Sequence, residues 1–210
     1  MRGIKRTRGA AQREAKPLFR EDLFLVLDAM GDRLKDARDK ALLLIGFAGG
    51  FRRSELVGLD RADIEVVRQG IILQLRRSKT DQMGLGRKIG IPHGRTRWCP
   101  VTALDHWLSR SGVTEGAVFR PIDRHGRIEA GRLSDEAVSL VLKGRLAAAG
   151  IDAAGYSGHS LRAGLATSAA QAGVSAWKIR QQTGHASDAM LGRYVRDGEL
   201  FIDNAAGALL

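Results

Sequence analysis

The stretch GHSLRAGLATSAAQAGVSAWKIRQQTGHASDAMLGRY, residues 158–194, decides how the C-terminal part of this chain folds. Leu161, Leu165 and Ala169 recur with the spacing of one helix face. They predict a helix that begins just after Gly158 and turns its apolar side toward a core.

A second helix is predicted over residues 176–182, with Trp177 and Ile179 as candidate core residues. Gly184 ends this helix, because glycine readily adopts the left-handed conformation that stops one. A third, short helix then leads to Tyr194. The stretch therefore predicts three helices joined by tight turns.

Four polar side chains of this stretch form a candidate constellation. His159 and Arg162 are three residues apart, so they are neighbours on one helix face. His185 follows the glycine that ends the second helix, and Tyr194 comes nine residues later. Each residue alone is more often structural than functional. Together they could all meet a single phosphate group.

Upstream, an apolar helix is predicted over residues 34–48 and ends at a Gly-Gly pair. The segment FRRSELVGL follows, with Ser54 as a plausible N-cap of the next helix. The exposed backbone of such a turn can aim Arg52 or Arg53 at a ligand. Glu55, in the first turn, is close enough to hold an arginine in place.

A change of period between residues 62 and 92 predicts a small sheet. The segments ADIEVV and GIILQL are rich in β-branched residues and are separated by a turn, which predicts a hairpin. A third strand, KIGIP, follows the loop RRSKTDQMGLGR. This loop places Arg76, Arg77 and Lys79 at the end of the hairpin, where a lysine can reach a DNA groove or an active site. An ordinary polar loop is the alternative.

Further helices are predicted from Arg20, from Pro100 and over residues 133–149. The fold class is therefore α+β, predominantly α-helical with a small antiparallel three-stranded sheet. Residues 1–18 are basic and lack an apolar period, so we expect a basic arm or interdomain linker there. Residues 19–210 are expected to form the folded domain.

The charge of the chain favours a polyanionic partner. A formal net charge of +11 and a pI near 10.6 draw the protein to nucleic acid first. Most of the basic residues are arginine, which suits bidentate phosphate contacts. A solvated basic surface without a partner is the alternative.

Composition also predicts a soluble, cytoplasmic protein. A single cysteine, Cys99, excludes an internal disulfide framework and fits a reducing compartment. No run of about 18 apolar residues is present that would span a bilayer, and the N-terminus lacks the apolar core of a secretory signal.

No cofactor or metal is predicted. His93, His106 and His125 have no partners at metal-ligand spacing, so they are interpreted as surface or structural residues. Neither a GxxxxGK[ST] nor a GxGxxG stretch occurs, so no nucleotide cofactor is implied.

These motifs, in this order, resemble those of the tyrosine recombinase (phage integrase) family. The family pattern is Gly-hydrophobic-Arg-x-Ser-Glu-Leu, a lysine in a hairpin loop, His-x-x-Arg, Gly-His, and a tyrosine nine residues after that histidine. The matching segments are GFRRSEL, RSKTD, HSLR, TGH and GRY, which carry Arg52, Lys79, His159 with Arg162, His185, and Tyr194.

The resemblance implies DNA cleavage and rejoining through a covalent 3'-phosphotyrosine, without metal or ATP. Tyr194 is then the nucleophile, His159 the base and Lys79 the acid. Phosphate donors would be Arg52, Arg162 and His185, while Glu55 orients Arg52. Arg76 and Arg77 are expected to contact DNA. The implied partners are double-stranded DNA and further copies of the chain, as a tetramer on DNA.

Two positions depart from the common pattern. Arg53 stands where the family more often has a hydrophobic residue, and Thr183 replaces a common leucine. Family members usually carry an N-terminal core-binding domain, so we expect this chain to be an excised catalytic domain or a short relative.

Two other functions are compatible with parts of the pattern. A type IB topoisomerase uses similar chemistry to relax supercoils, and a non-catalytic DNA-binding module would need only the charge. The apolar tail, residues 197–210, favours recombination if it docks on a neighbouring protomer; packing on its own domain is the alternative.

Overall fold

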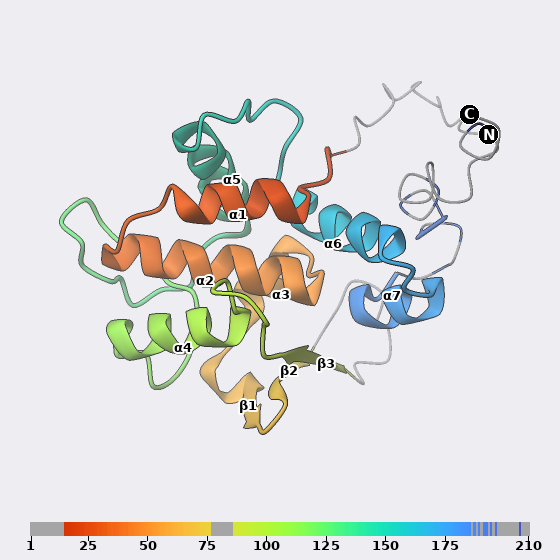
Figure 1. Ribbon diagram of the computed structural model, residues 1–210. Helices are drawn as coiled ribbons and strands as arrows, with labels where there is room; N and C mark the ends of the chain where they lie inside the picture. The colour runs from red at the N-terminus through yellow and green to blue at the C-terminus, as the bar shows by residue number, and fades with distance from the viewer. Residues whose placement is uncertain are drawn as a thin grey trace, which may run out of the picture.

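The computed structural model describes residues 15–76 and 86–185, and single residues at 187, 189, 191, 192, 194, 196 and 206. These residues form the predicted α+β fold, in which helices make up most of the molecule and one small antiparallel sheet lies at its lower edge in Figure 1, beside α4. In chain order the elements are α1 (Arg20–Asp28), α2 (Leu34–Gly49), α3 (Arg53–Gly58), η1 (Arg61–Asp63), β1 (Ile64–Val67), β2 (Gly70–Leu75), β3 (Arg87–Pro92), α4 (Pro100–Ser111), α5 (Asp135–Ala148), α6 (His159–Gln171) and α7 (Ala176–Thr183).

Helix α2 forms the centre of the core. Its run from Ala41 to Ile45 is buried throughout, as its nearly continuous apolar sequence predicts. It packs along α4 and also contacts α6 and β3. At its end Gly50 adopts the left-handed conformation, with φ of 58°. This stop turns the chain sharply into α3, the element that follows the predicted Gly-Gly break.

The sheet has the strand order β1-β2-β3 and is antiparallel throughout. In β2 the alternate residues Ile71, Leu73 and Leu75 are buried, which is the period-2 pattern of a strand with one face on a core. The first strand begins two residues later than the ADIEVV segment predicts. The preceding residues form the short 3-10 helix η1, in which the Asp63 carboxylate accepts a hydrogen bond from the Asp60 backbone N–H at 2.9 Å.

Two further local predictions are wrong. Ser54 is not the N-cap of α3, because that helix begins at Arg53 and Arg52 is the residue before its first turn. Trp177 is not a core residue: 66% of its surface is exposed, whereas Ile179 on the same short helix is buried. With only eight residues in α7, helical spacing alone did not determine which side faces the core.

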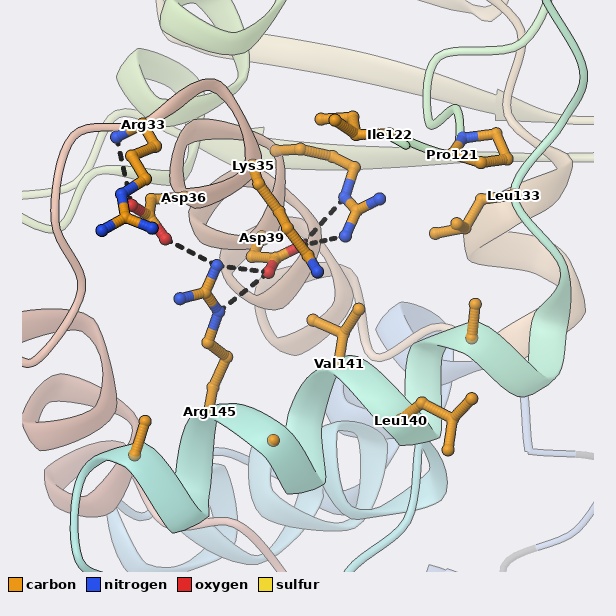
Figure 2. Close-up of a pocket in the computed structure, with 14 residues that line it drawn as sticks. Arg33, Lys35, Asp36, Asp39, Pro121, Ile122, Leu133, Leu140, Val141 and Arg145 are labelled. Atoms are coloured by element: carbon orange, nitrogen blue, oxygen red, sulfur yellow. Dashed lines mark hydrogen bonds and ion pairs between the residues drawn. The ribbon is translucent and has the colours of Figure 1, made fainter. Parts of the chain in front are cut away.

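A network of ion pairs joins α2 to α5 and includes none of the predicted site residues. Asp36 and Asp39 of α2 both bind the Nη2 atom of Arg145 on α5 at 2.6 Å (Figure 2). Arg38 also pairs with Asp39. These groups border a cavity of about 580 Å³, which is lined by none of the predicted site residues. The ion pairs along one side of this cavity hold α2 and α5 together.

In the part of the chain that the structure describes, no helix combines the length and apolar character needed to cross a membrane.

Candidate active site

Three arginines from distant parts of the chain converge on the C-terminal end of α7. They are Arg52 at the start of α3, Arg87 at the start of β3, and Arg162 on α6. The last carbonyls of a helix have no partner within it and carry partial negative charge. The end of α7 therefore attracts the guanidinium groups, and Figure 1 shows α7 beside α6 with β3 close by.

Arg162 is the most deeply buried of the three, at 1% exposure. Its Nη1 donates to the carbonyl oxygen of Gly50 at 2.8 Å and to that of Thr183. Among the described residues, no carboxylate forms an ion pair with it. Burial, together with the nearby positive charge of Arg52, lowers the pKa of Arg162 to about 10. A buried cation in this condition favours the arrival of an anion.

Arg52 is held by Glu55. Its Nη1 donates to the Glu55 carboxylate at 2.6 Å, and its backbone N–H donates to the other carboxylate oxygen at 2.9 Å. Nη2 of Arg52 donates to the Gly184 carbonyl at 3.3 Å. Glu55 is buried and also lies 3.4 Å from Nη2 of Arg87. One carboxylate thus serves two of the three arginines, so the described cluster retains an excess of positive charge.

Arg87 is a residue that the sequence reasoning missed. Its Nη1 donates to the Gln182 carbonyl at 2.9 Å, and its Nη2 donates to the Thr183 carbonyl at 3.1 Å. Burial is the main cause that lowers its pKa. Alternation along β3 was the available signal, because Arg87 shares a strand face with the buried Ile89 and Ile91. Arg87 therefore ties the sheet to the end of α7.

His185 lies directly after this helix end and is buried. Its Nδ1 is 2.7 Å from the hydroxyl oxygen of Thr183. Burial is the main cause that lowers the pKa of His185 to about 3, and the positive charges of Arg162 and Arg52 are the next largest. The imidazole is therefore neutral at physiological pH.

Tyr194 and His159 lie next to each other in the same cluster. Nε2 of His159 lies 2.9 Å from the hydroxyl oxygen of Tyr194. The ring centroids of His185 and Tyr194 are 5.7 Å apart. His159 is the first residue of α6, so the helix that buries Arg162 also presents His159 one turn earlier. A phenol thus lies beside an imidazole and near buried cations.

The structure brings together six of the nine residues that the sequence singles out: Arg52, Glu55, His159, Arg162, His185 and Tyr194. Arg76 lies elsewhere, with its Nε donating to Asp63 at 2.6 Å. Arg77 and Lys79 lie outside the described residues. The chemical roles of all nine stay predictions.

No group of three or more histidine, cysteine, aspartate or glutamate side chains within the described ranges is arranged to hold a metal ion.

Comparison with known proteins places this cluster in a family. The sequence pattern of the phage integrase family matches residues 18–199. An integrase/recombinase xerD homolog from Selenomonas ruminantium is 42% identical over 207 residues, which cover 98% of this chain and 61% of that protein. The chain thus spans less than two thirds of the length of this relative.

Solved structures share the fold at low sequence identity. The XerH site-specific recombinase bound to a palindromic difH substrate has a TM-score of 0.74 at 18% identity, covering 96% of this chain and 55% of that one. The lambda integrase tetramer bound to a Holliday junction has a TM-score of 0.61 at 17% identity, covering 90% and 50%. With the sequence pattern matched over most of its length, the chain belongs to the phage integrase family.

Proposed function

We propose that this chain is the catalytic domain of a site-specific DNA recombinase that cleaves and rejoins DNA through a covalent 3'-phosphotyrosine. The observation that carries the proposal is the buried Arg162, which has no carboxylate partner among the described residues and lies in one cluster with Tyr194. A phosphodiester is the anion that fits both a cluster of arginines and a nucleophilic phenol.

The positive cluster acts on the phosphate. A phosphodiester carries one negative charge, and further charge builds on its oxygens as a nucleophile adds. Arg52 and Arg162 donate hydrogen bonds to the nonbridging oxygens and stabilise that charge. Glu55 keeps the guanidinium of Arg52 oriented through its bond at 2.6 Å. Because these donors are already held in place by the end of α7, little reorganisation is needed when DNA binds.

The nucleophile and its base are adjacent. The Tyr194 oxygen attacks phosphorus, its proton moves to Nε2 of His159 at 2.9 Å, and the bond to the DNA 5'-oxygen breaks. Lys79 protonates that leaving oxygen. The phosphotyrosine bond retains the energy of the broken DNA bond, so a 5'-hydroxyl can reverse the step. The reaction therefore requires neither metal nor ATP.

The partner is double-stranded DNA, and the DNA substrate implies a cytoplasmic location. Arg76 and Arg77 contact the DNA backbone, and Arg76 then shares its guanidinium with Asp63. Similarity to the lambda integrase tetramer on a Holliday junction supports a tetramer of this chain on DNA. The apolar residues of the segment 197–210 suit docking on a neighbouring protomer of that assembly.

Adduct formation tests the nucleophile. On a nicked suicide substrate the wild-type chain is expected to form a covalent protein–DNA band, and Tyr194→Phe is expected to abolish it while DNA binding persists. Tyr156→Phe is the matched control, because Tyr156 is the other tyrosine of the chain and lies buried with its hydroxyl 3.4 Å from Asp22. A band that persists in Tyr194→Phe, or disappears in Tyr156→Phe alone, contradicts the assignment.

A second assay separates recombination from DNA relaxation. Supercoiled plasmid and a pair of target sites are incubated with the same protein preparation. The proposal predicts strand exchange between the sites. Relaxation without exchange would instead indicate a type IB topoisomerase activity, and salt-sensitive binding without any adduct would indicate a DNA-binding module.

A further inference from the structure

The hydroxyl group of Thr183 has two close neighbours. Thr183 is the last residue of α7 and is fully buried. Its oxygen lies 2.7 Å from the backbone carbonyl oxygen of Ile179, one turn earlier, and 2.7 Å from Nδ1 of His185. Both distances are those of good hydrogen bonds. A hydroxyl has only one proton to donate, so the two contacts cannot both be donations from Thr183.

The Ile179 carbonyl determines where the Thr183 hydroxyl proton lies. The Ile179 carbonyl oxygen can only accept. If the Thr183 proton pointed at His185, two oxygen atoms would face each other at 2.7 Å in a buried site with no proton between them. With the proton on the side of Ile179, the hydroxyl oxygen accepts from an N–H at Nδ1 of His185, and both contacts are satisfied.

We infer that Thr183 is a positioning residue that holds His185 in the tautomer with its proton on Nδ1. Nε2 is then the ring nitrogen that carries the lone pair in the DNA-free protein. The tautomer itself depends only on the geometry of the α7 end, whereas its consequence for DNA cleavage rests on the proposed function.

The charges around His185 support a ring with a single proton. The charged and titratable groups that face it are Arg162 and His159 on α6, Arg52 at the start of α3, Arg87 on β3, and Tyr194, whose ring centroid is 5.7 Å away. Burial, followed by the positive charges of Arg162 and Arg52, lowers the pKa of His185 to about 3. At neutral pH the imidazole therefore accepts at Nε2.

This state differs from the donor role that family resemblance implies for His185. A nonbridging phosphate oxygen is itself an acceptor, so Nε2 can bond to it only after His185 has taken up a proton. The imidazolium would still donate from Nδ1 to Thr183. Binding of a DNA phosphate at Nε2 is therefore coupled to uptake of one proton from solvent. A leucine at position 183 would have no hydroxyl group to accept the hydrogen bond from Nδ1.

The tautomer can be measured without DNA. Side-chain nitrogen NMR distinguishes a protonated ring nitrogen from one with a lone pair, and the His185→Gln spectrum identifies the signals of His185 among the five histidines. The wild-type protein is expected to show a protonated Nδ1 and an unprotonated Nε2. Thr183→Ser keeps the hydroxyl and should keep this pattern.

Thr183→Val removes the acceptor at nearly unchanged shape. The loss of one buried hydrogen bond should shift the tautomer ratio toward the Nε2-protonated form by roughly tenfold or more. Thr167→Val is the matched control, because the Thr167 hydroxyl is also buried but has no hydrogen-bond partner among the described residues. Its spectrum should match that of the wild type.

Two results would overturn the inference: a wild-type His185 with its proton on Nε2, or a Thr183→Val spectrum with an unchanged tautomer. If Thr183→Val does not fold, the wild-type and Thr183→Ser spectra still decide the tautomer. Failure of the proposed function is seen separately, as a missing covalent adduct in the presence of an Nδ1-protonated His185.

Discussion

The burial and the lowered pKa of Arg162 depend on residues far from it in the sequence. The His-x-x-Arg spacing predicts that His159 and Arg162 share a helix face, and α6 does place them one turn apart. The sequence does not predict that Arg162 is buried, because its cover comes from Gly50, 112 positions away, and from Thr183. Motif spacing therefore identified the cation, whereas its depressed pKa depends on tertiary packing.

The burial of His185 should make the free energy of unfolding depend on pH. Its pKa falls from an ordinary 6.5 to about 3 in the folded state, so the unfolded chain binds the proton more tightly. The free energy of unfolding should then fall as the pH drops from about 8 to about 5, with a slope from this group of up to about 1.4 kcal/mol per pH unit below its unfolded pKa. Urea denaturation across this range measures the slope.

His185→Gln provides the comparison, because glutamine does not titrate. The difference in unfolding free energy between the wild type and this variant should change with pH in favour of the variant as the pH falls. If the two curves run parallel over the whole range, His185 is not held neutral in the folded protein.

At the scale of elements, the end of α7 is the junction on which the cluster is built. Gly184 adopts φ of 68°, and a Cβ atom placed there would lie 2.5 Å from Nη1 of Arg87. The sequence predicts that α7 ends here, because glycine readily adopts the left-handed conformation that ends a helix. It does not predict that an arginine from β3 packs on the stop, since strand and helix are distant in sequence.

Gly184→Ala should therefore lower stability by more than its backbone strain alone. Alanine in the left-handed region costs about 1 kcal/mol, and the displaced guanidinium of Arg87 adds to that cost. Gly173→Ala is the matched control, because Gly173 has φ of 73° and a Cβ atom added there would meet nothing within 4 Å. If the two variants lose the same unfolding free energy, displacing the Arg87 guanidinium adds no cost, and its packing against Gly184 does not contribute to stability.

Helix α6 is anchored from its other side by the segment before α1. The backbone N–H of Leu18 donates to the Ser160 carbonyl at 3.0 Å, and Leu18 is fully buried. Its carbonyl presses against Gly164, where any Cβ atom would collide with it. Residues at the end of the predicted basic arm thus pack on the helix that carries His159 and Arg162.

Gly164→Ala should force this segment away from α6. Overpacking of this kind costs about 1–3 kcal/mol, and the rate of adduct formation should fall with the displaced helix. Gly144→Ala on α5 is the control, because nothing lies within 4 Å of that position and alanine favours a helix by about 0.5–1 kcal/mol. Thermal or urea unfolding that ranks both variants as equally stable would refute the anchoring role of Leu18.

At the scale of the whole molecule, apolar periodicity predicted α1 to α7 and the three-stranded sheet to within a few residues. The short helix predicted before Tyr194 lies partly outside the described residues. The apolar pattern succeeds for β2 because the buried residues Ile71, Leu73 and Leu75 alternate along the strand, and for α2 because a nearly continuous apolar run forms a buried helix. It fails for Trp177, since a helix as short as α7 contacts the core with few residues. The order of elements in space, and with it the meeting of Arg52, Arg87 and Arg162, is a tertiary property that local patterns do not contain.

The most direct test of the central claim is to identify the residue and the DNA end that are joined. The adduct trapped on a suicide substrate is digested with nuclease and trypsin and analysed by mass spectrometry. Trypsin cuts after Arg193 and Arg196, so the account predicts the tripeptide Tyr-Val-Arg with Tyr194 linked to a 3'-phosphate, and a free 5'-hydroxyl on the released strand. A nucleotide on any other peptide, or a linkage to the 5' end, would contradict it.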